Sequence, residues 1–422
     1  MEMTDLRKAV SLLGSSGGLA NAVLALLDAA AADPTDPLHA DLTAGEIHLI
    51  DKNQATIERY ADRFPHLSSR IRLHQFDLRD IEAFKRHLDD TGTKLVIDVS
   101  WADTLSMLEC CNELGVSYLN TALENAEVDA DPTLYGFPLT ERYERFEKRR
   151  TEFGNLQAVV CSGMNPGVVQ WMAWELTRGD PGRDPLACYI VERDTSFFAD
   201  PALFRPKTVY ASWSIECFLD EAILSYPMFV RDRLPHYFRE EVYDAEYKIT
   251  LGDVQFYGCL MPHEEVLTLG TLKDWETGFV YRVSERMTRV IRDHLDNVDE
   301  LWEWEQTLLD PSVGEIDGED LVGVLLVYEN EEKYMYNVLS SREIYPVYRT
   351  NATYFQVACG VYAAAACLLS GDVPRGVHYV DELLHSGHAV RYGEYLQRYM
   401  TAFVRGTNPK SDGLLSQRRR EA

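Results

Sequence analysis

The chain has 422 residues, of which 46% are hydrophobic, and a formal net charge of −27. This length can bury two separate cores, and the apolar content excludes an intrinsically disordered protein. The negative charge argues against nucleic acid as a partner, since phosphates need a basic surface. A net charge of this sign would attract polycations, although such a charge more often serves only to keep a protein soluble.

Eight cysteines occur without the paired Cys or Cys/His spacing of a metal site. We therefore expect reduced thiols in a cytoplasmic protein and no metal centre. The amino terminus lacks a positive segment followed by an apolar one, so we expect no secretory signal. The longest uncharged stretch, residues 354–371, contains Gln356 and is short for a membrane span. It predicts a buried helix and no membrane association.

The first part of the chain alternates short apolar segments with amphipathic ones. Strands are predicted at residues 8–14, 46–51, 71–77, 94–100, 116–122 and 156–162. Helical patterns lie between several of them, at residues 18–32, 53–64 and 103–115. This alternation predicts an α/β fold with a doubly wound parallel sheet of Rossmann type.

From about residue 185 the pattern becomes mixed, with fewer regular crossovers. Strands are predicted at residues 186–194, 240–249, 254–261 and 321–330, and helices at residues 213–223, 281–294 and 295–310. We therefore predict a Rossmann domain at residues 1–170, joined by a returning helical segment at 349–385, and an α+β substrate and dimerisation domain at 171–348. Residues 405–422 are expected to be a polar, frayed tail.

The sequence "LLGSSGGLA" joins the first strand to the first helix, where a dinucleotide pyrophosphate would meet backbone N–H groups. Gly14 takes the first position of the glycine fingerprint, Ser16 stands where the second glycine belongs, and Gly17 and Gly18 keep the turn permissive. Asp51 ends the second strand, where a carboxylate can accept from both ribose hydroxyls and would repel a 2′-phosphate. These features favour NAD over NADP, although a glycine-rich turn alone can serve only chain reversal.

Polar residues also follow the later strands. Asp77 follows the third strand and is expected near the adenine. Ser100 follows the fourth strand, and Glu124 follows the fifth. Each residue alone could simply cap a loop, but ligands bind at the carboxyl ends of the strands in open α/β sheets. Together these residues predict a nucleotide crevice.

The stretch "SWSIECFLDEA", residues 212–222, places an aromatic residue among carboxylates. At about 100° per residue, Trp213 would share a helix face with Glu216 and Asp220, with Glu221 at its border, opposite the apolar face. One interpretation is an aromatic packed on a loop above a solvated acidic face. The other is a receptor for an organic cation, with the indole for cation–π contact and the carboxylates for ammonium hydrogen bonds.

Five motifs, in order, resemble those of the bacterial homospermidine synthase family, which belongs to the saccharopine-dehydrogenase-like group. They are "CSGMNPGVVQWM" at 161–172, "SWSIECFLDE" at 212–221, "MPHEEVLTL" at 261–269, "DGEDLVGVLL" at 317–326 and "YRTNATYFQVACGV" at 348–361. The resemblance implies a Rossmann domain carrying NAD and a smaller domain that, together with it, encloses a diamine. One putrescine is oxidised to an imine, ammonia leaves as a second putrescine attacks, and the stored hydride reduces the product.

The resemblance also implies roles for individual residues. Trp213 would hold a cationic intermediate against its ring, and Asn165 would lie near nicotinamide and substrate. The acids carried over are Glu124, Glu221, Glu265 and Asp320, and Asn351 is carried over to the cofactor site. His263 would match the family's histidine, and its ordinary pKa near neutrality makes it a candidate base that frees an amine for hydride loss. Without the family, His263 could equally be a surface histidine in a turn.

The leading hypothesis is thus an NAD-dependent homospermidine synthase acting on putrescine, with spermidine as a further candidate donor, and relatives suggest a homodimer. The first alternative is a carboxyspermidine- or saccharopine-type dehydrogenase that reduces an imine with NADPH. It would need a cationic clamp, for which Arg193, Arg205 and Lys207 are candidates. The second alternative is a non-catalytic NAD-binding regulator of polyamine level.

Overall fold

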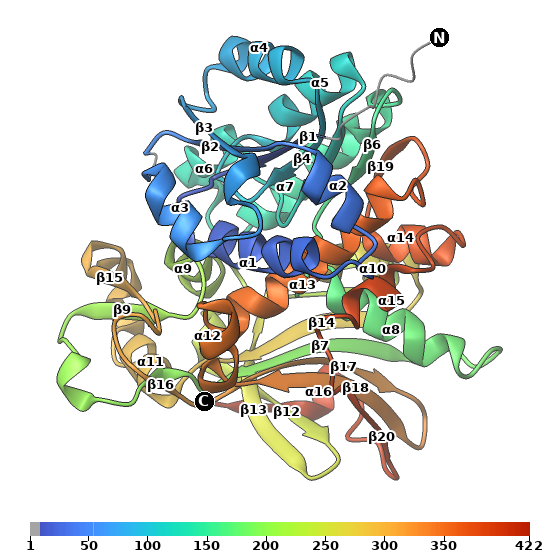
Figure 1. Cartoon of the computed structure of the whole chain (residues 1–422). Helices are drawn as coiled ribbons and strands as arrows, with labels where there is room; N and C mark the ends of the chain where they lie inside the picture. The colour runs from blue at the N-terminus through green and yellow to red at the C-terminus, as the bar shows by residue number, and fades with distance from the viewer. Residues whose placement is uncertain (1–8, 54) are drawn as a thin grey trace. The chain divides into compact units, whose positions relative to one another are not determined.

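The computed structural model describes residues 9–53 and 55–422, and the chain divides into two compact units (Figure 1). Unit 1 comprises Met1–Glu127, Arg142–Gly163 and Phe355–Tyr399, and unit 2 comprises Val128–Glu141, Met164–Tyr354 and Met400–Ala422. The amino terminus, for which no secretory signal is expected, lies outside the described residues.

Unit 1 contains a seven-stranded parallel sheet, as the alternating sequence pattern predicts. Its strand order is β19-β6-β5-β4-β1-β2-β3, so the first six strands follow the Rossmann order 3-2-1-4-5-6. The α/β fold class is confirmed. The strands are β1 (Ala9–Leu13), β2 (Ile47–Asp51), β3 (Ile71–Gln75), β4 (Thr93–Asp98), β5 (Ser117–Asn120), β6 (Gln157–Val159) and β19 (Gly376–His378).

Helices of unit 1 begin and end where the sequence supplies caps. The clearest case is α5 (Thr104–Leu114): the side chain of Asp103 accepts from the N–H of Ser106 at its start, and Gly115 ends it in the left-handed region. The other helices of this unit are α1 (Gly18–Ala32), α2 (His39–Ala44), α3 (Ile57–Arg63), α4 (Ile81–Thr91), α14 (Val380–His385) and α15 (Tyr392–Leu396). Three helices cross unit boundaries: α6 (Ala126–Asp129), α7 (Pro138–Arg149) and α13 (Ala352–Leu369).

The apolar helix predicted near residues 354–371 is α13. It is the one helix among the described residues that is long and apolar enough to cross a membrane, and 83% of its 18-residue window is buried inside the protein. Such burial is typical of the core helix of a soluble protein. At Gly360 an added Cβ would lie 1.9 Å from the carbonyl oxygen of Gly163, so only glycine allows this approach of two backbones.

Unit 2 is built on a ten-stranded mixed sheet whose main order is β20-β18-β17-β7-β14-β13-β12-β21. Its strands are β7 (Ala187–Asp194), β10 (Met228–Arg231), β11 (Leu234–Tyr237), β12 (Ala245–Leu251), β13 (Val254–Met261), β14 (Glu276–Arg282), β17 (Asp320–Val327), β18 (Glu332–Leu339), β20 (Val404–Asn408) and β21 (Arg419–Glu421). Two small sheets add β8 (Phe197–Phe198), β9 (Thr208–Ala211), β15 (Glu305–Leu308) and β16 (Ile316–Asp317).

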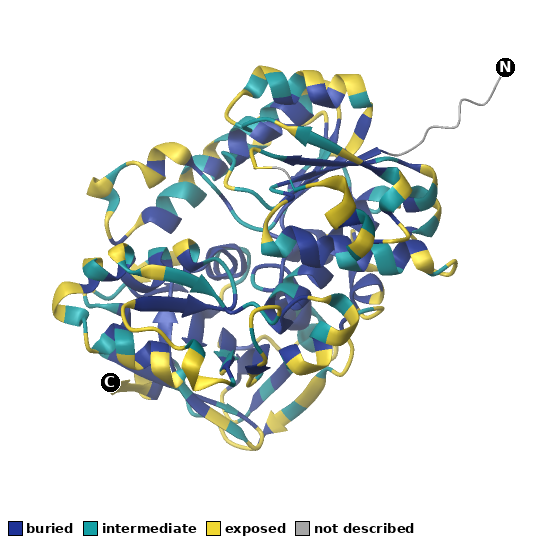
Figure 2. Ribbon diagram, turned by 60° about the vertical axis from the view of Figure 1, so that its left-hand side comes forward, coloured by how far each residue is buried: buried dark blue, intermediate teal, exposed yellow. Residues whose placement is uncertain are grey.

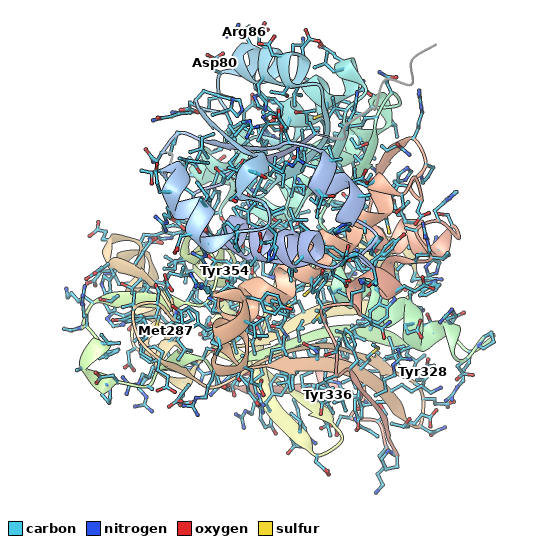
Figure 3. All side chains as sticks on the ribbon, viewed as in Figure 1. Asp80, Arg86, Met287, Tyr328, Tyr336 and Tyr354 are labelled. Atoms are coloured by element: carbon cyan, nitrogen blue, oxygen red, sulfur yellow. The ribbon has the colours of Figure 1, made fainter. Side chains whose placement is uncertain are left out.

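The two faces of this mixed sheet differ in chemistry. Residues Tyr189 and Val191 of β7, Val280 of β14 and Leu321 of β17 belong to one apolar core, against which Tyr336, labelled in Figure 3, also packs. Because side chains alternate along a strand, the residues between them lie on the other face. In Figure 2 the central strands of both sheets are coloured as buried, so side chains on both faces are shielded from water.

Three helical predictions in unit 2 were partly wrong. The helices present are α8 (Val168–Arg178), α9 (Ile215–Ile223), α10 (Glu264–Leu272), α11 (Glu285–Arg292), α12 (Ser341–Tyr348) and α16 (Leu415–Arg418). The segment 281–294 starts as the end of β14, because Ser284 caps α11 only at that point. The segment 295–310 is a kinked 3-10 helix, Leu295–Glu303, followed by β15.

The helix expected from residue 213 begins only at Ile215, because the side chain of Ser214 accepts from the N–H of Cys217 as its cap. Trp213 therefore precedes α9 and shares no helix face with Glu216 and Asp220. The interpretation of one acidic helix face carrying the indole was wrong.

The polar carboxyl-terminal segment is not frayed. It contains β20, α16 and β21, and β21 pairs with β12. Arg418 forms an ion pair with Glu332 in which neither side chain is exposed. The sequence did not indicate this order, because charged residues that form a buried pair look like solvent-exposed residues in a sequence pattern.

Candidate functional site

The loop after β1 in unit 1 has the geometry of a nucleotide cradle. Gly14 has a φ of +73°, and a Cβ on it would lie 2.9 Å from the carbonyl oxygen of Val99. Gly17 donates its N–H to the carbonyl of Gly14 at 3.0 Å, and α1 begins at Gly18. Residues with side chains would crowd this turn. Its glycines therefore leave the backbone N–H groups at the start of α1 accessible to an anion.

Asp51 ends β2 beside this loop. Its carboxylate accepts from the N–H and the hydroxyl of Ser16, at 3.0 and 2.7 Å, and from the N–H of Asn53 at 2.8 Å. Ser16, which replaces a fingerprint glycine, thus fixes the carboxylate at the position that a ribose would approach. The residues present fit a dinucleotide.

The other residues predicted for the nucleotide also follow strand ends. Ser100, after β4, donates to Asp98 at 2.6 Å, and the backbone N–H of Glu124 donates to Thr104 at 2.9 Å. Asp77, after β3, pairs with Arg79, whose hydrogen bonds lower the pKa of this carboxyl to about 2. Because all of these strands are parallel, the residues lie at one edge of the sheet. Their role in nucleotide binding stays a prediction.

Unit 2 gathers buried acids, some of which were predicted from the sequence and some of which were not. On the sheet face opposite its apolar core, Glu192 and Asp194 extend from β7 and Asp320 from β17, and all three are buried. Tyr281 of β14 stands beside Glu192 in register. Glu221 of α9 and Glu265 of α10 are also buried, with exposures of 7% and 0%. We call Glu192, Asp194, Glu221, Glu265 and Asp320 the buried acid cluster.

Burial makes three of these acids, Glu192, Glu221 and Asp320, hard to ionise. It raises the pKa of Glu192 to about 8, while a hydrogen bond from Asn165 opposes the rise. Burial also raises the pKa of Asp320, and the nearby charges of Glu192 and Asp194 raise it further. The pKa of Glu221 is likewise raised by burial, against the lowering effect of His263. Without a cationic partner, these groups therefore favour their protonated forms.

His263 is enclosed by carboxyl groups. Its Nδ1 forms a short contact with Glu265, and its Nε2 lies 3.6 Å from Glu221 Oε1. Burial acts to lower the pKa of His263, but Glu265 and then Glu221 raise it well above its ordinary value. The imidazole is thus held as a cation. Glu221 Oε2 and Glu265 Oε1 are buried and receive no hydrogen bond from the described residues.

Possible ligand atoms of His263, Glu264 and Glu265 all lie within 4.8 Å of one another. Among the described residues this is a group that could hold a metal ion, whereas the sequence suggested no metal centre. The close contact between His263 and Glu265 gives the same atoms a partner within the chain.

Trp213 lies half-buried just before α9, with its indole N–H donating to the hydroxyl of Tyr281 at 3.2 Å. Burial raises the pKa of that hydroxyl, and the charges of Glu192 and Asp194 raise it further. The structure thus links the predicted tryptophan to the buried acid cluster through Tyr281.

Two predicted asparagines have clear partners. Asn165 donates to Glu192 at 2.8 Å. Asn351 donates to the carbonyls of Ser212 and Leu309, at 2.6 and 3.2 Å, and accepts from the N–H of Tyr354, labelled in Figure 3, at 2.8 Å. The amide of Asn351 therefore fixes the backbone of unit 2, and its assignment to the cofactor site stays a prediction.

Sequence reasoning missed Glu192, Asp194 and Tyr281. A signal was present in "CYIVERD": two acids two residues apart at the end of an apolar strand must share one face of the sheet.

The described fold is a Rossmann-type nucleotide domain combined with a mixed-sheet domain that carries buried acids. Residues 10–149 match the family model of the saccharopine dehydrogenase NADP binding domain. Residues 10–149, most of which lie in unit 1, are thus similar to a nucleotide-binding domain of the saccharopine dehydrogenase type. The match does not distinguish NAD from NADP.

Among solved structures, the apo saccharopine dehydrogenase (L-Glu forming) from Saccharomyces cerevisiae is similar to this chain, with a TM-score of 0.58 and 11% identity over 95% of this chain and 99% of that one. This likeness shows the fold. The UDP-glucose 4-epimerase from Bifidobacterium longum, in complex with NAD+ and UDP, has a TM-score of 0.25 and 11% identity over 36% of this chain and 52% of that one. The leucoanthocyanidin reductase–NADPH complex from Vitis vinifera has a TM-score of 0.26 and 15% identity over 44% and 57%. No curated protein sequence matches.

Proposed function

We propose that the protein is an NAD-dependent enzyme of diamine metabolism, a homospermidine synthase that transfers an aminobutyl group between two putrescines. The observation that carries the proposal is the buried acid cluster. Among the described residues, no arginine or lysine pairs with Glu192, Asp194, Glu221 or Glu265. Within the part of the chain that the structure describes, His263 is the one basic side chain that pairs with any of these four acids.

A cationic ligand suits such a site for an energetic reason. Buried carboxylates are costly unless they are paired, and so is a buried ammonium. A diammonium ligand would supply both missing charges and lower the raised pKa values of its partners. A dicarboxylate would instead add negative charge to the cluster. The net charge of −27 would favour the approach of a polycation to the whole molecule.

The aromatic residues fit the same ligand. The indole of Trp213 is fixed by its hydrogen bond to Tyr281, and its ring face can hold an alkylammonium group by cation–π attraction. Such a contact contributes about 2 kcal/mol when it is shielded from water. In this arrangement the indole contacts an alkylammonium group, and the buried acids bind the two ends of the diamine.

His263 takes a different role from the base that the sequence suggested. Because its pKa is raised, the imidazole is protonated at neutral pH and donates to Glu265. Glu221 lies at its other nitrogen and keeps Oε2 without a hydrogen bond from the described residues. Glu221 in its ionised form is therefore our candidate to accept a proton from a bound ammonium, which leaves a neutral carboxyl beside the His263 cation and a neutral amine.

The glycine loop and Asp51 would hold the nucleotide, which when bound would supply reversible hydride transfer. Asp51 favours NAD, because a 2′-phosphate would meet its negative charge. Since the hydride is returned, no net reductant is needed. We further propose a cytoplasmic homodimer.

A second candidate is a saccharopine-type dehydrogenase that reduces an imine with NADPH, and the match of residues 10–149 favours it. That reaction needs a free cationic clamp for a substrate carboxylate. Arg193 pairs with Glu319, Arg205 with Glu305 and Lys207 with Glu300, so each candidate cation already has an acidic partner. This pairing favours the diamine.

One incubation separates the candidates. Purified full-length protein, with and without a chelator, is incubated with putrescine and NAD, and amines are followed by mass spectrometry and NADH by absorbance. We expect homospermidine and ammonia without net NADH, in both conditions. Product only with an oxo acid, an amine and NADPH would establish the dehydrogenase instead. Nucleotide binding without turnover of either substrate set would indicate a regulator.

A further inference from the structure

Asp194 and Asp320 stand directly opposite each other on the antiparallel strands β7 and β17. Their exposures are 5% and 0%. Like charges in directly opposed positions of a sheet repel each other, and burial removes the water that would screen them. Two ionised carboxylates at this position would therefore be costly, and one retained proton would relieve the repulsion.

Two hydroxyl groups connect these carboxyls. Ser212 Oγ lies 2.5 Å from Asp194 Oδ2, and Thr353 Oγ1 lies 2.6 Å from Asp320 Oδ2. The two hydroxyl oxygens lie 3.0 Å apart. The four groups thus form a continuous chain of hydrogen-bond contacts, with a carboxyl group at each end.

This chain of hydrogen bonds is complete only with one proton more than its two hydroxyl groups supply. Each hydroxyl has a single proton to donate. If both acids were ionised, each hydroxyl would donate outward to its own acid, and no proton would lie between Ser212 and Thr353. One further proton on either acid turns every contact into a hydrogen bond. With Asp320 protonated, for example, donation runs from Asp320 through both hydroxyls to Asp194.

We propose that Asp320, Thr353, Ser212 and Asp194 form a proton relay that shares one proton between the two carboxyl groups. When the proton passes from Asp320 to Asp194, each O–H bond of the chain breaks as the next one forms. Both hydroxyl groups are unchanged afterwards, and the negative charge has moved to Asp320.

The surroundings hold the relay in place and favour the retained proton. The carbonyl of Ser212 accepts from Asn351, which fixes its backbone. The titratable groups that face the relay are Glu192, on the same face of β7, and Tyr281 of β14. Burial raises the pKa of Asp194 and of Asp320, so the pair resists losing its last proton.

The relay deepens the proposed function, on which this step rests. A bound ammonium must lose a proton before a hydride can leave its carbon. The ionised end of the relay is a second candidate acceptor for that proton, beside Glu221: an N–H bond breaks, an O–H bond forms, and the amine keeps its electron pair. Ser212 and Thr353 would then act as positioning residues that set which carboxyl is ionised.

Infrared spectroscopy of the ligand-free full chain tests the relay. We expect a carbonyl band of a protonated, hydrogen-bonded carboxyl at neutral pH that is lost in Asp320→Asn. In Thr353→Val that band should shift to a higher frequency, because the carboxyl of Asp320 loses its hydrogen bond with Thr353, whereas Thr353→Ser should retain the wild-type position. Thr208→Val is the matched control, because Thr208 is also a buried threonine and, among the described residues, its hydroxyl donates to the backbone carbonyl of Pro206 at 3.3 Å.

The relay is overturned if Asp320→Asn removes no such band, or if Thr353→Val leaves its frequency unchanged. Should Asp320→Asn fail to fold, the comparison of Thr353→Val with Thr353→Ser decides by itself. The spectra need no substrate. A protein that shows the shift but does not turn over putrescine would therefore retain the relay and lose the proposed function.

Discussion

The protonation of Glu192 gives a prediction with a definite sign. Burial raises the pKa of this carboxyl from 4.5 to about 8 in the folded chain. Below pH 4.5 the group is protonated in both the folded and unfolded states and contributes nothing. As the pH rises to 8, the unfolded chain loses this proton while the folded chain keeps it, so the free energy of unfolding falls.

The difference between these pKa values corresponds to at most about 5 kcal/mol, because one pKa unit is worth ~1.4 kcal/mol. Replacing Glu192 by Gln removes the ionisation while its side-chain oxygen can still accept from Asn165. We therefore expect Glu192→Gln to match the wild type at pH 4 and to be more stable by up to about 5 kcal/mol at pH 9.

The assay is chemical denaturation of the ligand-free protein at pH values from 4 to 9, within its reversible range. Glu329→Gln, at an exposed position, is the matched control and should show no such pH dependence relative to wild type. If the stability difference for Glu192→Gln were constant with pH, or if the variant were the less stable protein at pH 9, the reasoning would be refuted.

Three further outcomes are expected. Trp213→Leu should lower kcat/KM for putrescine about thirtyfold, for a loss of ~2 kcal/mol, with NAD affinity unchanged; equal kcat/KM values would contradict the cation–π role. Gly14→Ala should destabilise the protein by about 1–2 kcal/mol, because Gly14 has a positive φ and a carbonyl oxygen would lie 2.9 Å from the new Cβ. The same substitution should weaken NADH binding, measured by fluorescence. Gly154→Ala is the control, because no atom lies within 4 Å of a Cβ at that position. Arg418→Met should lower the free energy of unfolding by about 3–5 kcal/mol, because it removes the ion-pair partner of the buried Glu332 carboxylate. Arg419→Met, at the surface, should lower it far less in the same denaturation assay.

The nucleotide-binding fold could be predicted because its signals are local. Helix α1 was predicted at its observed bounds, and each strand of the first half was located from a short apolar segment. Strands covered on both faces consist almost wholly of apolar residues, as β1 does, so their positions are visible without knowledge of their neighbours.

The candidate site could be predicted only in part, because its geometry depends on register. Nothing local in the sequence shows that Asp194 faces Asp320, since that pairing follows from the alignment of β7 with β17. The face of Trp213 was predicted wrongly because one capping hydroxyl, that of Ser214, delays the helix. Buried charged residues such as Arg418 resemble surface residues until their partner is known.

The central claim is that the buried acid cluster binds an organic dication, and calorimetry of putrescine binding at neutral pH tests it most directly. A diammonium ligand should displace protons from carboxyls with raised pKa values, so we expect binding with net proton release, seen as a heat that depends on the buffer. Butylamine, with one charge, should bind more weakly. Binding of glutamate but not of putrescine would contradict the claim.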